Sequence, residues 1–328
     1  MPGCRIGFVG AGGVAARHAD TLAAFGDVEL VAVTDVDGRR ARAFAEERGV
    51  RAVPGVEQLI DTGVDAVYVC VPPFSHGPVE KAVAAAGLAV FVEKPIGLDC
   101  GEAEQTARLL EEAGVVTSAG YHWRYSDGVT RAREAVRDTS VRLAVGAWLD
   151  KVPPVRWWTS RAQSGGQVVE QAVHVLDLAR LMVGEVVEVH AMGDGQPPDA
   201  PGADVDGATV VNLRFAGGAV GTLAATCLLG WKHRVGLEVY AADLAVSITE
   251  DAVEVAGRSG ESEVRRLDPA LAKQAADRAF VDAVLGRGGN IRAPYADAVR
   301  TQRLACAVAD SAARGVAVKL EEHAHASG

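Results

Sequence analysis

A glycine-rich hexapeptide directly after a short apolar run is the feature that most restricts the fold of this chain. The hexapeptide GAGGVA, residues 10–15, follows the strand-like run CRIGFV and precedes a helical stretch at about residues 14–25. The pattern G-x-G-x-x-A between a strand and a helix allows a tight turn, close approach of the backbone to a pyrophosphate, and close packing of helix on sheet. The sequence therefore predicts a dinucleotide-binding turn that contains Gly10, Gly12, Gly13, Val14 and Ala15.

Asp35 bears on which dinucleotide is bound. It ends the second strand-like run, VELVAVTD, 20 residues after Ala15. A carboxylate at this place accepts hydrogen bonds from the adenosine ribose and repels a 2′-phosphate. Arg39 and Arg40 follow, and either could pair with that phosphate instead. We expect NAD, with NADP as the less favoured alternative.

The order of the predicted elements indicates an α/β protein with two domains. Strands and helices alternate over residues 1–120, which predicts an N-terminal Rossmann domain with a doubly wound parallel sheet. Residues 121–320 contain a helix at 168–183, several strand-like runs joined by short turns, and two final helices at about 269–285 and 294–313. This pattern predicts a C-terminal α+β domain with an open, mainly antiparallel sheet. Residues 321–328 are expected to be a disordered tail.

Charge and hydrophobicity restrict the location and partners of the chain. The net charge of −10 and the pI near 5.3 argue against a nucleic-acid or anionic-membrane surface. No apolar run approaches the roughly 20 residues that span a bilayer. A first strand that begins by residue 4 leaves no space for a signal peptide, and the scattered cysteines have no spacing typical of a metal site. We expect a cytoplasmic protein without a bound metal.

The segment FVEKPIG, residues 91–97, ends a buried strand in charged residues and a proline. One interpretation is that charged residues simply mark the end of a strand. The other is that Lys94 points to a ligand, because ligands of parallel sheets bind at the carboxyl ends of the strands. We also predict a cis bond between Lys94 and Pro95. Bonds before proline are usually trans, and a strand-tip lysine that must turn into a crevice is a place where the rarer cis form is expected.

Several motifs in a specific order resemble those of the Gfo/Idh/MocA oxidoreductases, the family of glucose–fructose oxidoreductase and inositol 2-dehydrogenase. They are the glycine loop, VCVPPFSH (69–76), EKP (93–95), GYHWRY (120–125), SGGQVVEQAVHVLDLARLMVGE (164–185) and the closing segment from residue 295. The resemblance covers nearly the whole chain. It implies that the strand-tip residue Lys94 is catalytic.

The resemblance also implies a catalytic acid and histidine in the second domain. Glu170 stands where the family has an aspartate, and His174 stands at the place of the family's histidine, four residues later. On a continuous helix Glu170, His174 and Asp177 share one face, and this narrow polar stripe must face water or a ligand cleft. Gln171 could share the place of Glu170.

Other candidate residues lie in segments that contact cofactor or substrate in the family. His122, Trp123 and Arg124 are candidate substrate contacts, and Trp157 and Trp158 are candidates for a wall that stacks on a sugar ring. Packing within the protein is the alternative for both groups. The candidates beside the cofactor are Val71, Pro72, His76, Glu93, Lys94 and Pro95.

Together these residues predict an NAD-dependent oxidoreductase that interconverts a secondary hydroxyl and a ketone on a sugar, inositol or related polyol. Lys94 and His174 would carry the acid–base chemistry in one cleft, and Glu170 would orient the histidine. The alternatives are a glycosidase that uses bound NAD for transient oxidation and a non-catalytic sugar or nucleotide sensor. Poor polar alternation in the run AVGTLAATCLL further predicts a homo-oligomer that packs through the C-terminal sheet.

Overall fold

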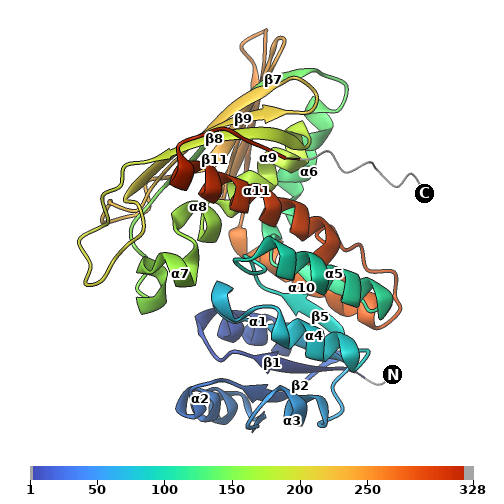
Figure 1. Ribbon diagram of the computed structural model, residues 1–328. Coiled ribbons are helices and arrows are strands. Elements are labelled where there is room, and N and C mark those ends of the chain that lie inside the picture. Colours follow the sequence, from blue (N-terminus) through green and yellow to red (C-terminus); the bar gives the residue numbers. More distant parts are fainter. Residues whose placement is uncertain (1–2, 321–328) are drawn as a thin grey trace. The chain divides into compact units, whose positions relative to one another are not determined.

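The computed structural model describes residues 3–320, and the predicted tail at 321–328 lies outside the described residues. The chain forms two compact units (Figure 1). One unit contains the residues up to Tyr125 together with Ala270–Val299, and the other contains Ser126–Pro269 and the residues from Arg300 onward. Within the described range, no helix is long and apolar enough to cross a membrane.

The first unit contains a six-stranded parallel sheet in the order β3-β2-β1-β4-β5-β6. The strand order reverses direction between β1 and β4, which is the arrangement of a doubly wound Rossmann sheet and confirms the predicted fold. Its strands are β1 (Cys4–Val9), β2 (Val28–Thr34), β3 (Arg51–Ala52), β4 (Ala66–Val69), β5 (Ala89–Val92) and β6 (Thr117–Ala119). Its helices are α1 (Gly13–Ala23), α2 (Gly38–Arg48), α3 (Val56–Ile60), α4 (Pro78–Ala85), α5 (Cys100–Glu112) and α10 (Pro269–Val284).

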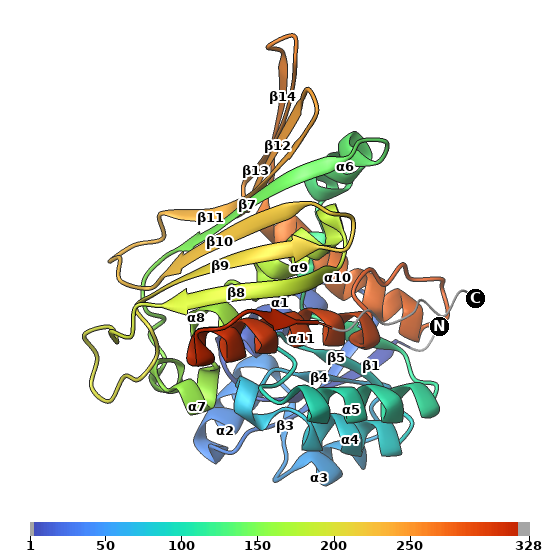
Figure 2. The same ribbon diagram turned by 45° about the horizontal axis from the view of Figure 1, so that its top comes forward.

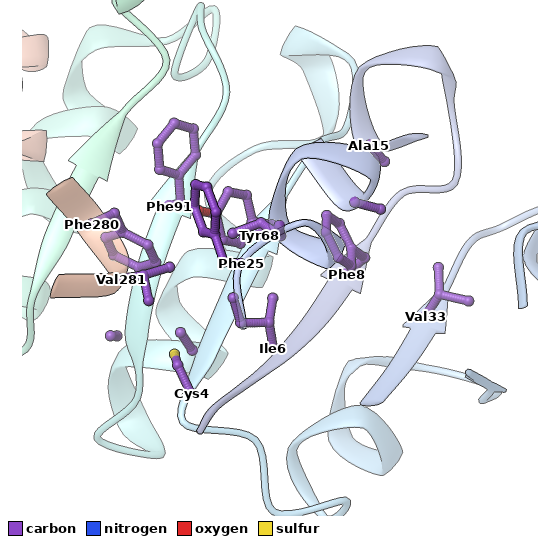
Figure 3. Close-up of a cluster of buried hydrophobic side chains, with 14 of the residues drawn as sticks. Cys4, Ile6, Phe8, Ala15, Phe25, Val33, Tyr68, Phe91, Phe280 and Val281 are labelled. Carbon is purple, nitrogen blue, oxygen red and sulfur yellow. The ribbon is translucent and has the colours of Figure 1, made fainter. Parts of the chain in front are cut away.

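Aromatic side chains form much of the core on one face of this sheet (Figure 3). Tyr68 of β4 stacks on Phe91 of β5 with ring centroids 4.7 Å apart, and Phe280 of α10 contacts both rings edge-on. Phe280 and Val281 are fully buried in this cluster. Helix α10 is therefore part of the first unit, although it follows the second unit's sheet in the sequence. The predicted domain boundary at residue 120 does not include this return of the chain to the first unit.

The second unit contains a nine-stranded sheet in the order β14-β13-β12-β11-β7-β10-β9-β8-β15 (Figure 2). The neighbouring strands pair antiparallel except β7 and β10, which pair in parallel, so the sheet is mainly antiparallel as predicted. The strands are β7 (Val141–Leu149), β8 (Val186–Gly193), β9 (Ala208–Phe215), β10 (Val220–Thr226), β11 (Arg234–Ala241), β12 (Leu244–Thr249), β13 (Ala252–Gly257), β14 (Ser262–Arg266) and β15 (Val318–Lys319).

Helices cover one face of the second sheet. The helices are α6 (Asp127–Val136), α7 (Arg161–Ser164), α8 (Gln167–Glu170), α9 (Val173–Val183) and most of α11 (Tyr295–Arg314). Helix α9 packs across β7 and β11, and Gly146 of β7 allows this, because a Cβ there would lie 2.8 Å from a Val175 methyl carbon. The alternate residues of β7 to β10 point to the opposite face, which no described helix of this unit covers.

The predicted helix over residues 168–183 is interrupted. It is divided into α8 and α9, with Gln171 and Ala172 between them. The amide of Ala172 donates to the carbonyl of Gln167, and the amide of His174 donates to that of Gln171, so the turn changes its hydrogen-bond spacing there. Glu170 and His174 therefore do not belong to one regular helix.

A buried polar network connects α9 to α11 within the second unit. The Thr301 hydroxyl donates to Asp177 at 2.8 Å and accepts from Arg180 at 2.6 Å, and Arg180 forms two hydrogen bonds with Glu185. Asp177 is 2% exposed. The predicted polar stripe therefore does not extend to Asp177, whose carboxylate has a structural role.

Because of this network, we expect the nearly isosteric substitution Thr301→Val to lower the stability of the protein. Thr301→Val removes the hydroxyl and leaves buried polar groups of Asp177 and Arg180 without it, so the free energy of unfolding should fall by about 1–3 kcal/mol. Urea denaturation measures this. Thr21→Val, at the partly exposed surface of α1, is the matched control and should change stability little; equal effects of both changes would contradict the role given to Thr301.

Candidate active site

The glycine loop after β1 leaves the amino end of α1 open. Gly10 has φ +95°, and a Cβ there would lie 2.3 Å from the carbonyl oxygen of Cys70, so only glycine fits. A Cβ at Gly12 or Gly13 would meet no atom within 4 Å, and Gly12 begins the helix without a side-chain cap. The first amides of α1, around Val14 and Ala15, are thus available to a phosphate group.

The Asp35 carboxylate holds the glycine loop against the end of β2. Its Oδ2 accepts the amide of Ala11 at 2.8 Å, and its Oδ1 accepts the amide of Asp37 at 2.7 Å and a guanidinium nitrogen of Arg40 at 2.9 Å. Arg40 is thereby paired with Asp35, while the side chain of Arg39 is largely exposed. A bound dinucleotide would meet a carboxylate at this edge, which fits NAD.

The other predicted cofactor residues follow β4 and β5, at the same edge of the sheet. Because β1, β4 and β5 are adjacent and parallel, their carboxyl ends bring the glycine loop, the segment 71–76 and the segment 93–95 together. Val71, Pro72 and Lys94 are partly exposed there. The bond between Lys94 and Pro95 is cis, which confirms the prediction.

His76 and Glu93 point into the protein at this edge. His76 is buried, its Nδ1 lies 2.5 Å from the fully buried Glu80 carboxylate, and its Nε2 lacks a hydrogen-bond partner among the described atoms. Glu80 also accepts the amide of Gly77. Glu93 contacts His18 of α1, 2.9 Å away. Sequence reasoning missed His18; its only signal is a polar residue among Ala15, Ala19 and Leu22, the buried face of α1.

His174 lies in the first turn of α9 in the second unit. It is 7% exposed, and its ring stacks on Trp148 of β7 with centroids 5.9 Å apart and an interplanar angle of 16°. The indole N–H of Trp158 donates to Glu170 at 2.7 Å. Glu170, at the end of α8, is thus fixed by Trp158, a contact that sequence reasoning did not predict.

The two tryptophans of the Pro-rich loop have different environments. Trp158 is fully buried in a cluster with Val205 and Cys227, so its ring is not an exposed wall for a sugar. Trp157 is half-buried and packs against the same cluster. The packing of Trp158 in this cluster fixes its indole ring, so that the N–H is directed at Glu170.

Gln171 occupies the break between α8 and α9. Its Oε1 is buried and has no hydrogen-bond partner among the described atoms. A buried amide oxygen without a partner costs free energy. A ligand hydroxyl that donates to this oxygen would remove that cost.

The GYHWRY segment is mostly interior. Arg124 is buried and contacts Asp297 at 2.5 Å and the carbonyl of Arg292 at 3.0 Å. Trp123 is also buried, and His122 is half-buried. The guanidinium of Arg124 therefore connects this segment to the beginning of α11, within the first unit. Among residues 3–320, no cluster of three or more His, Cys, Asp or Glu side chains suits a metal ion.

An open glycine loop after the first strand of a parallel sheet, beside the point where the strand order reverses, is typical of dinucleotide-binding proteins. Residues 4–121 match the model of the oxidoreductase family with an NAD-binding Rossmann fold, and residues 129–260 match a GFO/IDH/MocA C-terminal domain. The chain belongs to the Gfo/Idh/MocA family of oxidoreductases with an NAD-binding Rossmann fold.

Characterised relatives include inositol dehydrogenases. The chain is 32% identical to myo-inositol 2-dehydrogenase of Thermotoga maritima over 70% of its own length and 71% of the relative's. It is 27% identical to scyllo-inositol 2-dehydrogenase (NAD⁺) of Bacillus subtilis over 74% and 73% of the two chains. A levoglucosan dehydrogenase in complex with NADH and L-sorbose has the same fold, with a TM-score of 0.89, 20% identity and coverage of 98% and 100%.

The position of Asp35 predicts how cofactor preference changes. NAD should be preferred over NADP. Asp35→Ser should lower the ratio of kcat/KM with NAD to kcat/KM with NADP by about 10-fold, which corresponds to the loss of one hydrogen bond to a charged group. The loop amide of Ala11 also loses its acceptor, so affinity for both cofactors should fall. Steady-state kinetics with each cofactor tests this. Glu29→Ser, at the opposite end of β2, is the control; comparable efficiency of the unaltered protein with NAD and NADP would contradict the expectation.

Proposed function

We propose that this protein oxidises one secondary hydroxyl of inositol, a related cyclic polyol or a sugar to a ketone. The observation that supports this most is the place of Lys94, which follows β5 at the same sheet edge as the glycine loop. Bound NAD supplies the hydride acceptor. The identities with inositol dehydrogenases favour a cyclic polyol over other CH–OH compounds.

Three side chains have separate roles in the proposed reaction: one accepts the proton, one stabilises the developing charge and one orients the base. His174 takes the hydroxyl proton as general base, because an imidazole has a pKa close to neutral pH. The ammonium of Lys94 stabilises the negative charge that develops on the oxygen. Glu170, held by the indole N–H of Trp158, acts as the carboxylate that orients the base.

Gln171 contributes to recognition in this proposal. Its unpartnered Oε1 accepts a hydrogen bond from a second hydroxyl of the polyol, next to the one that is oxidised. A site that offers such an acceptor discriminates against analogues without the hydroxyl, because the buried oxygen then stays unpaired. Deoxy analogues of the best substrate should therefore react with lower kcat/KM.

Substitution of the catalytic side chains tests the chemistry. His174→Ala and Lys94→Ala should each lower kcat by about 10²-fold or more, the scale of general acid–base catalysis, with NAD affinity largely unchanged. Glu170→Gln should cost less, because Glu170 does not exchange the proton. NADH formation with a panel of inositols and sugars measures the rates.

An exposed lysine provides the matched control for Lys94→Ala. Lys81→Ala, whose ammonium pairs with Glu102 at the surface, should retain normal turnover. Near-normal turnover of His174→Ala would remove the histidine from the mechanism. Bound NAD that is retained and not consumed during turnover would instead favour the glycosidase alternative, and absence of turnover with every compound would favour a sensor.

We further propose that the open face of the nine-stranded sheet packs against a second copy of the chain. Leu143, Val210, Val220 and Met192 on this face are between 39% and 53% exposed. Leu143 pairs with Val220 across β7 and β10, and Val210 pairs with Met192 across β9 and β8. One row of the same face, with Thr222, Asn212 and His190, lies between these two pairs. Exposed apolar pairs on a sheet face that no described helix of the unit covers are typical of a buried interface.

Light scattering tests this assembly. The unaltered protein should be an oligomer at micromolar concentration, and Val210→Glu should shift it to a monomer, because a buried unpaired carboxylate disfavours the contact. Val264→Glu, on β14 and 54% exposed, is the matched control and should not change the mass. A monomeric unaltered protein would rule the assembly out.

A further inference from the structure

A histidine that no step of the proposed reaction uses lies buried in the first unit between two carboxylates. His18 of α1 is 4% exposed. Its Nδ1 lies 2.7 Å from Asp277 of α10, and its Nε2 lies 2.9 Å from Glu93, the residue before Lys94. Asp277 is 1% exposed. Three segments far apart in the sequence thus meet at one imidazole ring.

Two aromatic rings also contact the imidazole, one tilted and one edge-on. The Tyr68 and Phe91 rings lie 5.2 Å and 5.0 Å from the His18 ring, centroid to centroid, and both belong to the aromatic core of the unit. This packing leaves the imidazole little freedom to turn. Its two nitrogens therefore stay directed at Asp277 and Glu93.

The Glu93 carboxylate connects His18 to the backbone at the catalytic strand tip. Its Oε1 contacts His18, and its Oε2 accepts the backbone amide of Lys94 at 3.1 Å. The same Oε2 would lie 2.6 Å from a Cβ at position 120, so Gly120 is required for Glu93 to lie there. Glu93 thus contacts the ends of both β5 and β6.

Only a charged imidazole satisfies both carboxylates. Ionised carboxylates accept hydrogen bonds and donate none, so each ring nitrogen must carry a proton. Burial alone would lower the pKa of His18, but the charges and hydrogen bonds of Asp277 and Glu93 outweigh it and raise the pKa to about 9. Burial alone would raise the pKa of Glu93, but the hydrogen bond and charge of His18 lower it to about 2. The other titratable groups that act on this cluster are Arg17 of α1, Tyr68 and Cys70 at β4, and Lys94.

We propose that His18 and Asp277 are positioning residues for Lys94. The His18 imidazolium, anchored by Asp277, holds the Glu93 carboxylate in one place, and Glu93 holds the backbone amide of Lys94. The inference rests on the proposed role of Lys94 in catalysis. It gives α10, which comes from the far end of the chain, a direct connection to the catalytic strand tip.

A loss of the charge on His18 weakens this arrangement in a defined way. A neutral imidazole carries one proton, so one of the two carboxylates loses its hydrogen bond. Glu93 then keeps at most a neutral hydrogen bond, and its buried negative charge is no longer balanced. The carboxylate should move or take up a proton, and the amide of Lys94 moves with it.

Asp277→Asn tests the inference through the pH profile of kcat. Removal of this negative partner lowers the pKa of His18, so the imidazolium persists only at lower pH. At about pH 6 the variant should be within about 3-fold of the unaltered protein, and at about pH 8.5 its kcat should be about 10-fold lower, the effect of a small misplacement of a catalytic group. Affinity for NADH, measured by fluorescence, should change less than about 3-fold at both pH values.

Two further variants complete the comparison. His18→Phe, which has no proton to lose, should lower kcat by about 10-fold at every pH. Asp282→Asn removes a carboxylate from the same helix α10 that pairs with Arg278 at the surface, and should leave kcat and its pH profile unchanged. A pH profile of Asp277→Asn that parallels the unaltered protein would overturn the inference, since a purely structural role predicts a uniform loss.

Nuclear magnetic resonance provides a test that needs no turnover. In the unaltered protein, both ring nitrogens of His18, assigned through contacts with Tyr68 and Phe91, should be protonated at about pH 7.5. In Asp277→Asn, the backbone amide resonance of Lys94 should shift together with the titration of His18. A singly protonated His18 in the unaltered protein, or a Lys94 amide that stays constant while His18 titrates, would overturn the proposal. Lack of turnover of the unaltered protein would instead refute the proposed function, and these resonances would still decide the role of His18.

Discussion

Parallel hydrogen bonding among β1, β4 and β5 is the constraint on which the candidate site depends. Parallel pairing places the carboxyl ends of all three strands at one edge, so the glycine loop, the segment with His76 and the segment with Lys94 become neighbours. The strand order reverses at the same point, between β1 and β4. A reversal leaves room beside the sheet edge where a dinucleotide can lie.

Charged and polar groups inside each unit connect segments that are distant in sequence. In the first unit, His18 joins α1 to the end of β5 and to α10. In the second unit, Thr301 joins Asp177 and Arg180 of α9 to α11. Buried polar groups tolerate little displacement, because each loses a partner when the geometry changes. Such networks fix the relative positions of the segments that they connect. Removal of one partner lowers stability, although the complete network adds little net stability over apolar packing.

The region of α8 and α9 departs from a regular helix at the residues for which we propose a catalytic role. Helices α8 and α9 are separated at Gln171, whose amide oxygen has no hydrogen-bond partner among residues 3–320. Glu170, one methylene longer than the aspartate of the family pattern, is held by the indole of Trp158. A glutamate at this position is thus supported by a residue that lies 12 positions earlier in the chain.

The sequence by itself determined the alternation of strands and helices in the first 120 residues, the mainly antiparallel character of the second sheet, and the glycine loop with Asp35. These features follow from local patterns: hydrophobic periodicity, turn residues and the spacing of glycines. It also marked Lys94, because a lysine and a proline at the end of a buried strand are unusual together. The roles of Lys94 and His174 in catalysis came from the family resemblance and stay predictions.

Only the tertiary structure decided which of the remaining polar and aromatic residues are structural. Arg124 forms an ion pair with Asp297, Trp158 is buried rather than exposed, and Asp177 accepts a hydrogen bond from Thr301. It also decided that α10 belongs to the first unit and that its Asp277 meets His18. These pairings join residues that are tens to hundreds of positions apart. No local pattern encodes them, because the partner of a buried charge depends on which distant segments the hydrophobic core brings together.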